Sequence, residues 1–319
     1  MTSTERAPAN RSARRVRRRR ILYAALILCA LYAGLGAALA WNTMRPYRRT
    51  PIETPEIYGL DYQAFTFQSQ DAVRLAGWYV PASSHAPHGV IILCHGIGGS
   101  KDAMLDSARY LHNAGFAAIL FDFRARGESG GNNCTLGFRE TDDLQAAVQW
   151  AERTPELQGA PIGVMGESLG AATAIMCAAR TPQIRAVIAE APFAQLDRAV
   201  DSHFRELVGS FAPLFSKPTQ WAGEIAIGRR AADISPLRDI ARIAPRPILI
   251  IEDAQDSLFP AAHTRALFDA AGKPKEIWTV AGAGHCGAAY AAPDEYARRI
   301  IAFFTDNLKP AGSPAIRHE

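Results

Sequence analysis

A serine framed by glycines, Gly166-Glu167-Ser168-Leu169-Gly170, constrains this chain more than any other feature. An apolar run typical of a buried strand, 161–165, precedes it, and small helix-forming residues, 171–179, follow it. A G-x-S-x-G sequence between a strand and a helix predicts a tight turn, in which the serine takes up strained backbone and glycines leave room two positions away. The hydroxyl then projects from the sheet edge beside the next backbone N–H. Attack on a carbonyl group needs both.

A second copy of the pattern lies at Gly127-Glu128-Ser129-Gly130-Gly131. Five residues separate it from the preceding apolar run, 117–121, and Asn132-Asn133 after it disfavours a helix start. Ser129 is therefore predicted to lie in a loop, and Ser168 is predicted to be the nucleophile.

The N-terminal region differs in composition from the rest of the chain. Residues 1–20 contain eight arginines and one acid, and residues 21–41 contain no charge. A stretch of about 20 apolar residues at ~1.5 Å per residue matches the ~30 Å hydrocarbon core of a bilayer. We expect a basic cytoplasmic tail over 1–20, a transmembrane signal anchor over 21–41 and a linker over 42–57. The prolines in the linker predict an extended tether that keeps the domain off the bilayer.

The arginine distribution also predicts an orientation. Eight arginines precede the apolar run, whereas Arg45, Arg48 and Arg49 follow it, which favours a cytoplasmic N-terminus and an extracytoplasmic domain. Cleavage of a secretory signal after Ala38-Leu39-Ala40 is the alternative, although typical signals have an apolar region of only ~7–15 residues. A cytoplasmic domain is a third possibility.

The net charge of +4 also arises from this region. Residues 1–50 hold 11 of the 35 basic residues, so that 24 basic and 30 acidic residues remain in 51–319. A domain with a formal charge of −6 lacks the excess of positive charge that attracts phosphates, so no nucleic-acid partner is expected.

Strand-like and helix-like runs alternate from residue 62 onward, as a mostly parallel sheet flanked by helices requires. We expect one α/β domain over 58–319 with an eight-stranded sheet, since such folds reach ~250 residues as a unit. The strand-like runs are 62–67, 73–80, 90–94, 117–121, 161–165, 184–188, 247–251 and 276–280, and the helical runs are 102–113, 140–153, 171–179 and 293–308.

The alternation breaks over 191–245, where aromatic and aliphatic residues lie among prolines and charges. We expect a small helical cap here, above the carboxyl edge of the sheet where open α/β sheets bind ligands. An ordinary helical connection is the alternative. The apolar content favours a small-molecule or lipid-like acyl substrate.

A serine nucleophile needs a base, and the base needs an acid that fixes its tautomer. His285 is the preferred base because it lies in a loop of small residues, 282–287, after the last strand. Asp256 is the preferred acid, with Asp253 as the alternative and Glu252 interpreted as structural. The chain order is then Ser…Asp…His. His85, His88, His95, His112, His203, His263 and His318 are expected to be structural or solvated.

The oxyanion that forms during attack needs backbone donors. We expect these to be the N–H groups of Leu169 and Ile97, the latter following His95-Gly96 in a loop that Gly98-Gly99 allows to come close.

The cysteines and histidines carry no metal-binding spacing, so no metal and no organic cofactor is expected. Cys134 and Cys286 both lie in loops expected near the active site, where a disulfide is conceivable in an oxidising compartment.

Several of these motifs together resemble the α/β-hydrolase superfamily. They are His95-Gly96-Ile97-Gly98-Gly99, the run 122–131, the elbow 166–170, Asp256 to Pro260 and Gly284-His285, within a match over 62–308. The run 135–144 resembles membrane-anchored α/β-hydrolases and prolyl-oligopeptidase-like hydrolases. This resemblance implies an α/β-hydrolase fold with esterase, thioesterase or peptidase chemistry. The chain departs from the usual pattern at Ala125 and at 252–256, without changing a catalytic atom.

The sequence thus predicts a membrane-tethered serine hydrolase that cleaves esters or thioesters through Ser168, His285 and Asp256. A peptidase for short peptides is the alternative enzyme. A non-catalytic binding module at the membrane is the alternative from another class. The sequence carries no signal for the oligomeric state.

Overall fold

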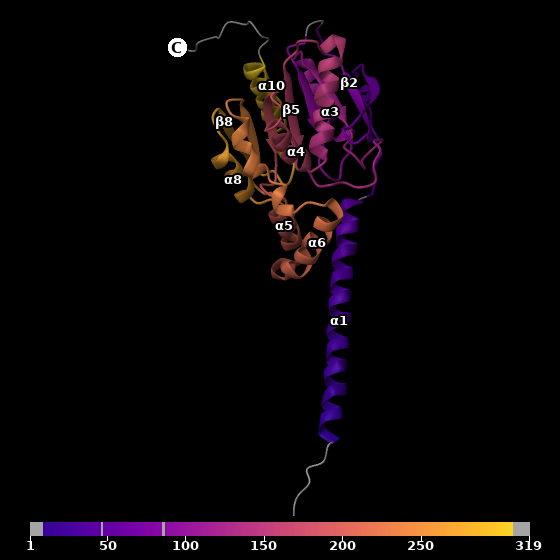
Figure 1. Ribbon diagram of the computed structural model, residues 1–319. Coiled ribbons are helices and arrows are strands. Elements are labelled where there is room, and N and C mark those ends of the chain that lie inside the picture. The colour runs from indigo at the N-terminus through magenta and orange to yellow at the C-terminus, as the bar shows by residue number, and fades with distance from the viewer. Residues whose placement is uncertain (1–8, 46, 85–86, 309–319) are drawn as a thin grey trace, which may run out of the picture.

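The computed structural model of the protein describes residues 9–45, 47–84 and 87–308. It consists of a long N-terminal helix, α1 (Ala9–Met44), and an α/β domain at the C-terminal end of that helix (Figure 1).

The domain is built on one eight-stranded sheet, with the strands in the order β1-β2-β4-β3-β5-β6-β7-β8. β1 pairs antiparallel with β2, and β2 pairs antiparallel with β4, whereas the other neighbours run parallel. The predicted fold is confirmed. The strands are β1 (Gln63–Gln68), β2 (Arg74–Val80), β3 (Val90–Cys94), β4 (Ala117–Phe121), β5 (Ile162–Glu167), β6 (Ile184–Glu190), β7 (Ile248–Asp253) and β8 (Lys275–Val280).

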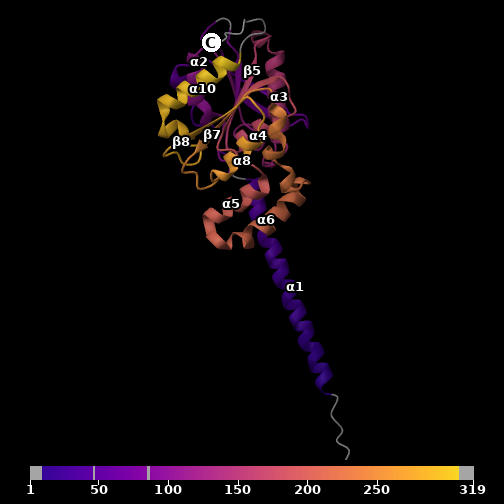
Figure 2. The ribbon, with the colours of Figure 1, turned by 90° about the vertical axis from the view of Figure 1, so that its left-hand side faces the viewer.

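Helices cover both faces of the sheet because its central strands are apolar on both sides (Figure 2). In β3, Val90 and Ile92 pack into one core layer, whereas Ile91 and Leu93 pack into the other, as the two-residue period of a strand requires. The first layer includes residues of α3 (Glu140–Arg153), α4 (Leu169–Ala178) and α8 (Ala262–Ala270), and the second includes residues of α2 (Leu105–Asn113) and α10 (Pro293–Asn307).

The predicted cap is a helical hairpin, and it is smaller than expected. α5 (Leu196–Val208), a short 3-10 turn (Gly209–Phe211) and α6 (Ala212–Ile227) project beyond the sheet beside α1 (Figure 1). The later part of 191–245 returns to the domain through a 3-10 turn (Ala231–Asp233), α7 (Pro236–Asp239) and another turn (Ile240–Ile243), of which Ile240 and Ile243 are core residues.

The segment after α1 is not the free tether that its prolines predicted. α1 begins inside the basic tail and continues through Met44, whose carbonyl accepts from the N–H of Cys134 at 2.8 Å. The Arg48 guanidinium then donates to the carbonyl of Gly131 at 2.7 Å, and Arg49 lies 3.6 Å from Asp102. The chain therefore leaves the helix already bound to the domain. By length and composition, α1 is able to cross a membrane over Ala13–Met44.

Two glycines permit the turn between β5 and α4. A Cβ on Gly166 would lie 2.4 Å from the carbonyl carbon of Gly170, and a Cβ on Gly170 would lie 2.1 Å from the carbonyl oxygen of Cys94. Both contacts are with backbone, which has no room to move in a close-packed sheet. The helix and the strands therefore pack this closely only with glycine at both positions.

We predict that Gly170→Ala lowers the free energy of unfolding by about 3 kcal/mol or more, because overpacking against backbone is not relieved by a rotamer change. Gly223→Ala is the matched control, since a Cβ at Gly223 would meet no heavy atom within 4 Å. That control should gain about 0.5–1 kcal/mol from helix propensity. Urea unfolding of the full chain in detergent measures both, and equal stabilities would contradict the packing argument.

Candidate active site

Ser168 occupies the strained position predicted for it. Its backbone lies at φ 53 and ψ −114, between β5 and α4, and its N–H donates to the carbonyl of Glu190 at 2.9 Å. Such a conformation costs a non-glycine residue ~1–3 kcal/mol and persists only where the surroundings impose it. The Oγ lies 2.8 Å from Nε2 of His285.

His285 is held from its other side by Asp256. Its Nδ1 lies 2.7 Å from Oδ2 of Asp256, whose Oδ1 accepts the N–H groups of Leu258 at 2.9 Å and Phe259 at 2.8 Å. A carboxylate at Nδ1 assigns the proton to that nitrogen, so Nε2 is free to accept from the serine. The three predicted residues are therefore brought into one hydrogen-bond chain.

The two competing carboxylates point elsewhere. Glu252 accepts from the hydroxyls of Thr264 at 2.6 Å and Thr279 at 3.0 Å, which agrees with a structural role. Asp253 is buried, 3 % exposed, and lies next to the loop of His285 without being its partner.

The second serine motif is structural. Ser129 is fully buried, and its Oγ donates to the carbonyl of Asp122 at 2.5 Å and accepts the N–H of Ala76 at 2.9 Å. Both hydroxyl functions are used to tie the loop to β2. Ser129 therefore has no base and no cavity to act in.

The loop after β3 approaches the serine as expected. A Cβ on Gly96 would lie 3.4 Å from Cβ of Ser168, and Ile97 and Leu169 line the same cavity as Ser168 and His285. No sequence pattern indicated what holds this loop. Lys101 is fully buried, with its Nζ 2.7 Å from Asp122 and its backbone N–H donating to the same carboxylate at 2.7 Å.

The remaining histidines are mostly structural. His95 accepts the N–H of Phe123 at Nε2, 3.2 Å, and burial lowers its pKa. His263 accepts the N–H of Ala194 at 3.1 Å and lies 3.2 Å from the hydroxyl of Ser202 on α5, which ties the cap to α8. His203 lines the cavity, contrary to expectation. His85 and His318 lie outside the described residues.

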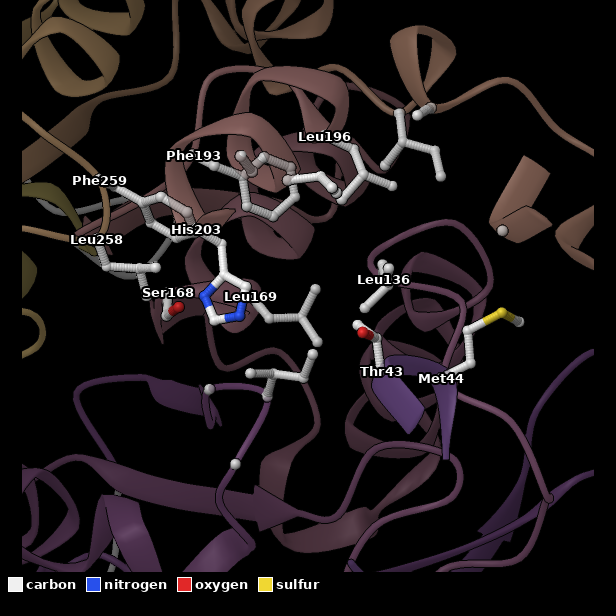
Figure 3. Close-up of a pocket in the computed structure, with 18 of the residues that line it drawn as sticks. Thr43, Met44, Leu136, Ser168, Leu169, Phe193, Leu196, His203, Leu258 and Phe259 are labelled. Atoms are coloured by element: carbon white, nitrogen blue, oxygen red, sulfur yellow. The ribbon is translucent and has the colours of Figure 1, made fainter. Parts of the chain in front are cut away.

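Ser168 opens onto a cavity of about 610 Å³ between the sheet edge, the cap and α1 (Figure 3). Its volume suits a drug-sized ligand. The lining is mainly aliphatic and aromatic, and includes Ile97, Leu136, Leu169, Phe193, Leu196, Val200, Phe204, Ile227, Ile234, Leu258 and Phe259. Sequence reasoning missed the contribution of α1, which supplies Ala40, Thr43 and Met44. Their place at the end of an apolar run signalled only a membrane span.

Three carboxyl groups are buried together beneath the turn. Burial raises the pKa of Glu167 to about 8, with the nearby Asp253 adding to the rise, and raises the pKa of Asp253 to about 6. Burial also raises the pKa of Glu190, whose carboxyl accepts from the hydroxyl of Tyr296 at 3.0 Å and the N–H of Ala288 at 3.2 Å. With a pKa of about 8, Glu167 is mostly protonated at neutral pH and so adds no charge beside Ser168.

The cysteines in the part of the chain that the structure describes are free thiols, so Cys134 and Cys286 form no disulfide here. Over the same residues, no group of three or more His, Cys, Asp or Glu side chains is placed to hold a metal ion.

The sequence is similar to known proteins over most of this domain. A family model described as "Serine aminopeptidase, S33" matches residues 85–239. An uncharacterized protein of Mycobacterium tuberculosis (strain ATCC 25618 / H37Rv) is 30% identical over 220 residues, which cover 68% of this chain and 70% of that protein. The chain belongs to the α/β-hydrolase superfamily. The uncharacterized protein YqkD of Bacillus subtilis (strain 168) is 29% identical over 258 residues, covering 78% and 81% of the two chains.

Solved structures agree with this membership. The Pyrococcus furiosus esterase Pf2001 aligns to this hydrolase with a TM-score of 0.69 and 26% identity, over 83% of this chain and 99% of the esterase. An esterase domain from Rhodothermus marinus shares the fold, with a TM-score of 0.58 and 20% identity, over 78% of this chain and 100% of that domain.

The raised pKa of Glu167 has a consequence for stability. Between the ordinary value of 4.5 and about 8, the folded state holds a proton that the unfolded state has lost. The free energy of unfolding therefore falls as pH rises through this window, by at most about 1.4 kcal/mol per pH unit for one group. We predict that Glu167→Gln flattens this decline, whereas Glu156→Gln on the exposed surface leaves it unchanged. Urea midpoints measured from pH 4.5 to 8 test this, and equal slopes in the two variants would contradict it.

Proposed function

We propose that this protein is a serine hydrolase that cleaves carboxylic esters or thioesters through an acyl-enzyme on Ser168. The observation that carries the proposal is the hydrogen-bond chain from Asp256 through His285 to Ser168, which ends at an apolar cavity.

In this proposal, Oγ of Ser168 attacks the ester carbonyl while Nε2 of His285 takes the hydroxyl proton. His285 then gives that proton to the leaving oxygen or sulfur, and the acyl group stays on the serine. Asp256 keeps the imidazole in the correct tautomer and stabilises its positive charge. In the second half, His285 activates a water that releases the acid and restores the serine.

The N–H groups of Ile97 and Leu169 are proposed to hold the oxyanion. Leu169 begins α4, so its N–H is one of the helix N-terminal donors without a partner inside the helix. Loss of one such donor typically costs ~2.7–4 kcal/mol of transition-state stabilisation. The ion pair of Lys101 with Asp122 fixes the loop that carries Ile97, and so positions this donor.

The cavity favours an acyl substrate over a peptide. A free peptide amine needs carboxylates to bind it, and two acidic residues, Glu167 and Glu224, line the cavity. Burial raises the pKa of Glu167 to about 8, so it is mostly uncharged at neutral pH. Oε1 of Glu224 already accepts the N–H of Ala231 at 2.9 Å. The aliphatic and aromatic lining instead suits a hydrocarbon chain.

We also propose that α1 anchors the hydrolase in the cell membrane, with its arginine-rich start in the cytoplasm and the domain outside. The charge bias across the apolar run and the helix Ala13–Met44 support this orientation.

The nucleophile is tested by labelling the full chain in detergent with a fluorophosphonate, which reacts with activated serines. We predict label at Ser168 by mass spectrometry. Ser168→Ala should lose both the label and ester hydrolysis, because within residues 9–45, 47–84 and 87–308 no other hydroxyl is hydrogen-bonded to His285. Ser129→Ala should keep at least a third of the activity, provided that it folds. Label at Ser129, or on no serine of the folded chain, would overturn the proposal.

The acid is tested by a matched pair of amides. Asp256→Asn should lower kcat by about 10⁴, because an amide at Nδ1 favours the wrong tautomer of His285. Asp253→Asn should stay within about threefold of the native kcat, because Asp253 is not the partner of His285. The reverse ranking in ester turnover would assign the acid to Asp253.

A further inference from the structure

The anchor helix is packed against the cap rather than standing free of it. Gly36, Ala40 and Met44 are buried and lie four residues apart, so they form one stripe along α1. A Cβ on Gly36 would lie 2.5 Å from both Cβ and the carbonyl carbon of Pro218 in α6. The two helices therefore approach at backbone contact, as small residues allow between helices in membranes.

This contact lies inside the charge-free part of α1. Gly36 is five residues before Trp41, the end of the expected membrane span, and five residues of helix span ~7.5 Å. If residues 21–41 occupy the hydrocarbon, Pro218 of α6 lies below its surface as well. Figures 1 and 2 both show the hairpin alongside α1, on the side of the domain from which that helix extends.

The surface of α6 and of the 3-10 turn before it matches such an environment, whereas α5 carries most of the charged residues of the hairpin. Soluble monomers rarely expose large contiguous apolar patches. α6 has only two charged residues among sixteen, Lys217 and Glu224. Five large apolar side chains on the hairpin are more than half exposed: Leu207 at 61 %, Phe211 at 64 %, Leu214 at 55 %, Trp221 at 67 % and Ile225 at 84 %.

The cavity of Ser168 reaches the seam between these two helices. Ala40 and Thr43 of α1 line it, and so do Gln220, Gly223 and Ile227 of α6. In Figure 3, Thr43 and Met44 lie across the cavity from Ser168, with Leu136, Leu169 and Leu196 in the same view. The end of the cavity that is remote from the nucleophile is therefore built by α1 and α6, the two helices of the seam.

We propose that α6 and the 3-10 turn before it are embedded in the bilayer beside α1, and that the α1–α6 seam admits the acyl chain of a membrane lipid ester directly from the hydrocarbon to Ser168. This inference rests on the proposed hydrolase function and names its substrate class. The occupant of the exposed apolar surface is the bilayer itself, because α6 packs directly against α1, whose exposed large side chains are apolar as well and which is long enough to cross a membrane. A chain that enters this way never has to cross water.

Two glycines of α1 offer a matched test of the seam. Gly36→Leu must push α1 away from Pro218, whereas a Cβ on Gly34 would meet no atom within 4 Å, so Gly34→Leu is the control. Both variants keep the span apolar. The full chain is reconstituted in phosphatidylcholine vesicles and assayed with 4-methylumbelliferyl oleate in the bilayer and 4-methylumbelliferyl butyrate in water. Each rate is divided by the amount of Ser168 that reacts with a fluorophosphonate.

We expect Gly36→Leu to lower the rate of oleate hydrolysis at least tenfold and to keep the rate of butyrate hydrolysis within threefold of that of the native chain. Gly34→Leu should keep both rates within threefold. If the two variants behave alike, or if Gly36→Leu loses both esters equally, the seam is not the route of the acyl chain. Failure of the hydrolase proposal gives a different result, because the native chain would then neither take the label nor cleave either ester.

The depth of the hairpin is measured separately with lipids brominated on their acyl chains. The difference in tryptophan fluorescence between the native chain and Trp221→Phe gives the emission of Trp221 alone. We expect the bromines to quench this emission. Ile225→Glu should slow oleate turnover at least fivefold, with Gln158→Glu, on the exposed connection before β5, as the control for an added charge. If the bromines do not quench Trp221, α6 is not embedded in the bilayer. Cross-linking would then show whether a second copy of the chain covers the exposed apolar surface instead.

Discussion

The turn at Ser168 is the constraint on which the rest of the site depends. Its left-handed backbone exists because Gly166 and Gly170 let α4 pack against β5 and β3 at backbone contact. The strain is offset by the surrounding core, since α4 is buried along its whole length. His285 and the loop of Ile97 are then placed around a serine whose position is set by this packing. Preorganisation of this kind lets donors meet developing charge without rearrangement.

A buried ion pair performs the corresponding task for the oxyanion loop. Lys101 has no exposed surface, contacts Asp122 and Glu128, and lies 4.5 Å from the ring centre of Trp78. Such a pair contributes little net stability, but it fixes the path of the chain, because removal of Lys101 would leave the buried carboxylate of Asp122 without its ion-pair partner. The loop after β3 is thus held by an ion pair, whereas the turn at Ser168 is held by close packing of backbone at two glycines.

The sequence predicted the sheet, the order of its elements and the residues of the hydrogen-bond chain, because these depend on local patterns. Apolar runs locate strands such as β3 and β4, and glycine spacing locates the turn at Ser168. The narrower cap, the docked segment after α1 and the buried Lys101 depend on contacts between distant parts of the chain. No periodicity marks these contacts, and a lysine beside glycines is equally typical of an exposed loop.

The stripe of Gly36, Ala40 and Met44 also limits which substitutions α1 can accept. A helix that only tethers a protein accepts any apolar residue at each position, provided that length and charge are kept. Here one face is limited to the shapes that fit α6 and the cavity, whereas the opposite face remains free. In the membrane-bound arrangement proposed above, replacing α1 by an unrelated membrane span would keep the protein at the membrane but leave the wall of its cavity unfilled. In that arrangement, location and selectivity are encoded on different faces of a single helix.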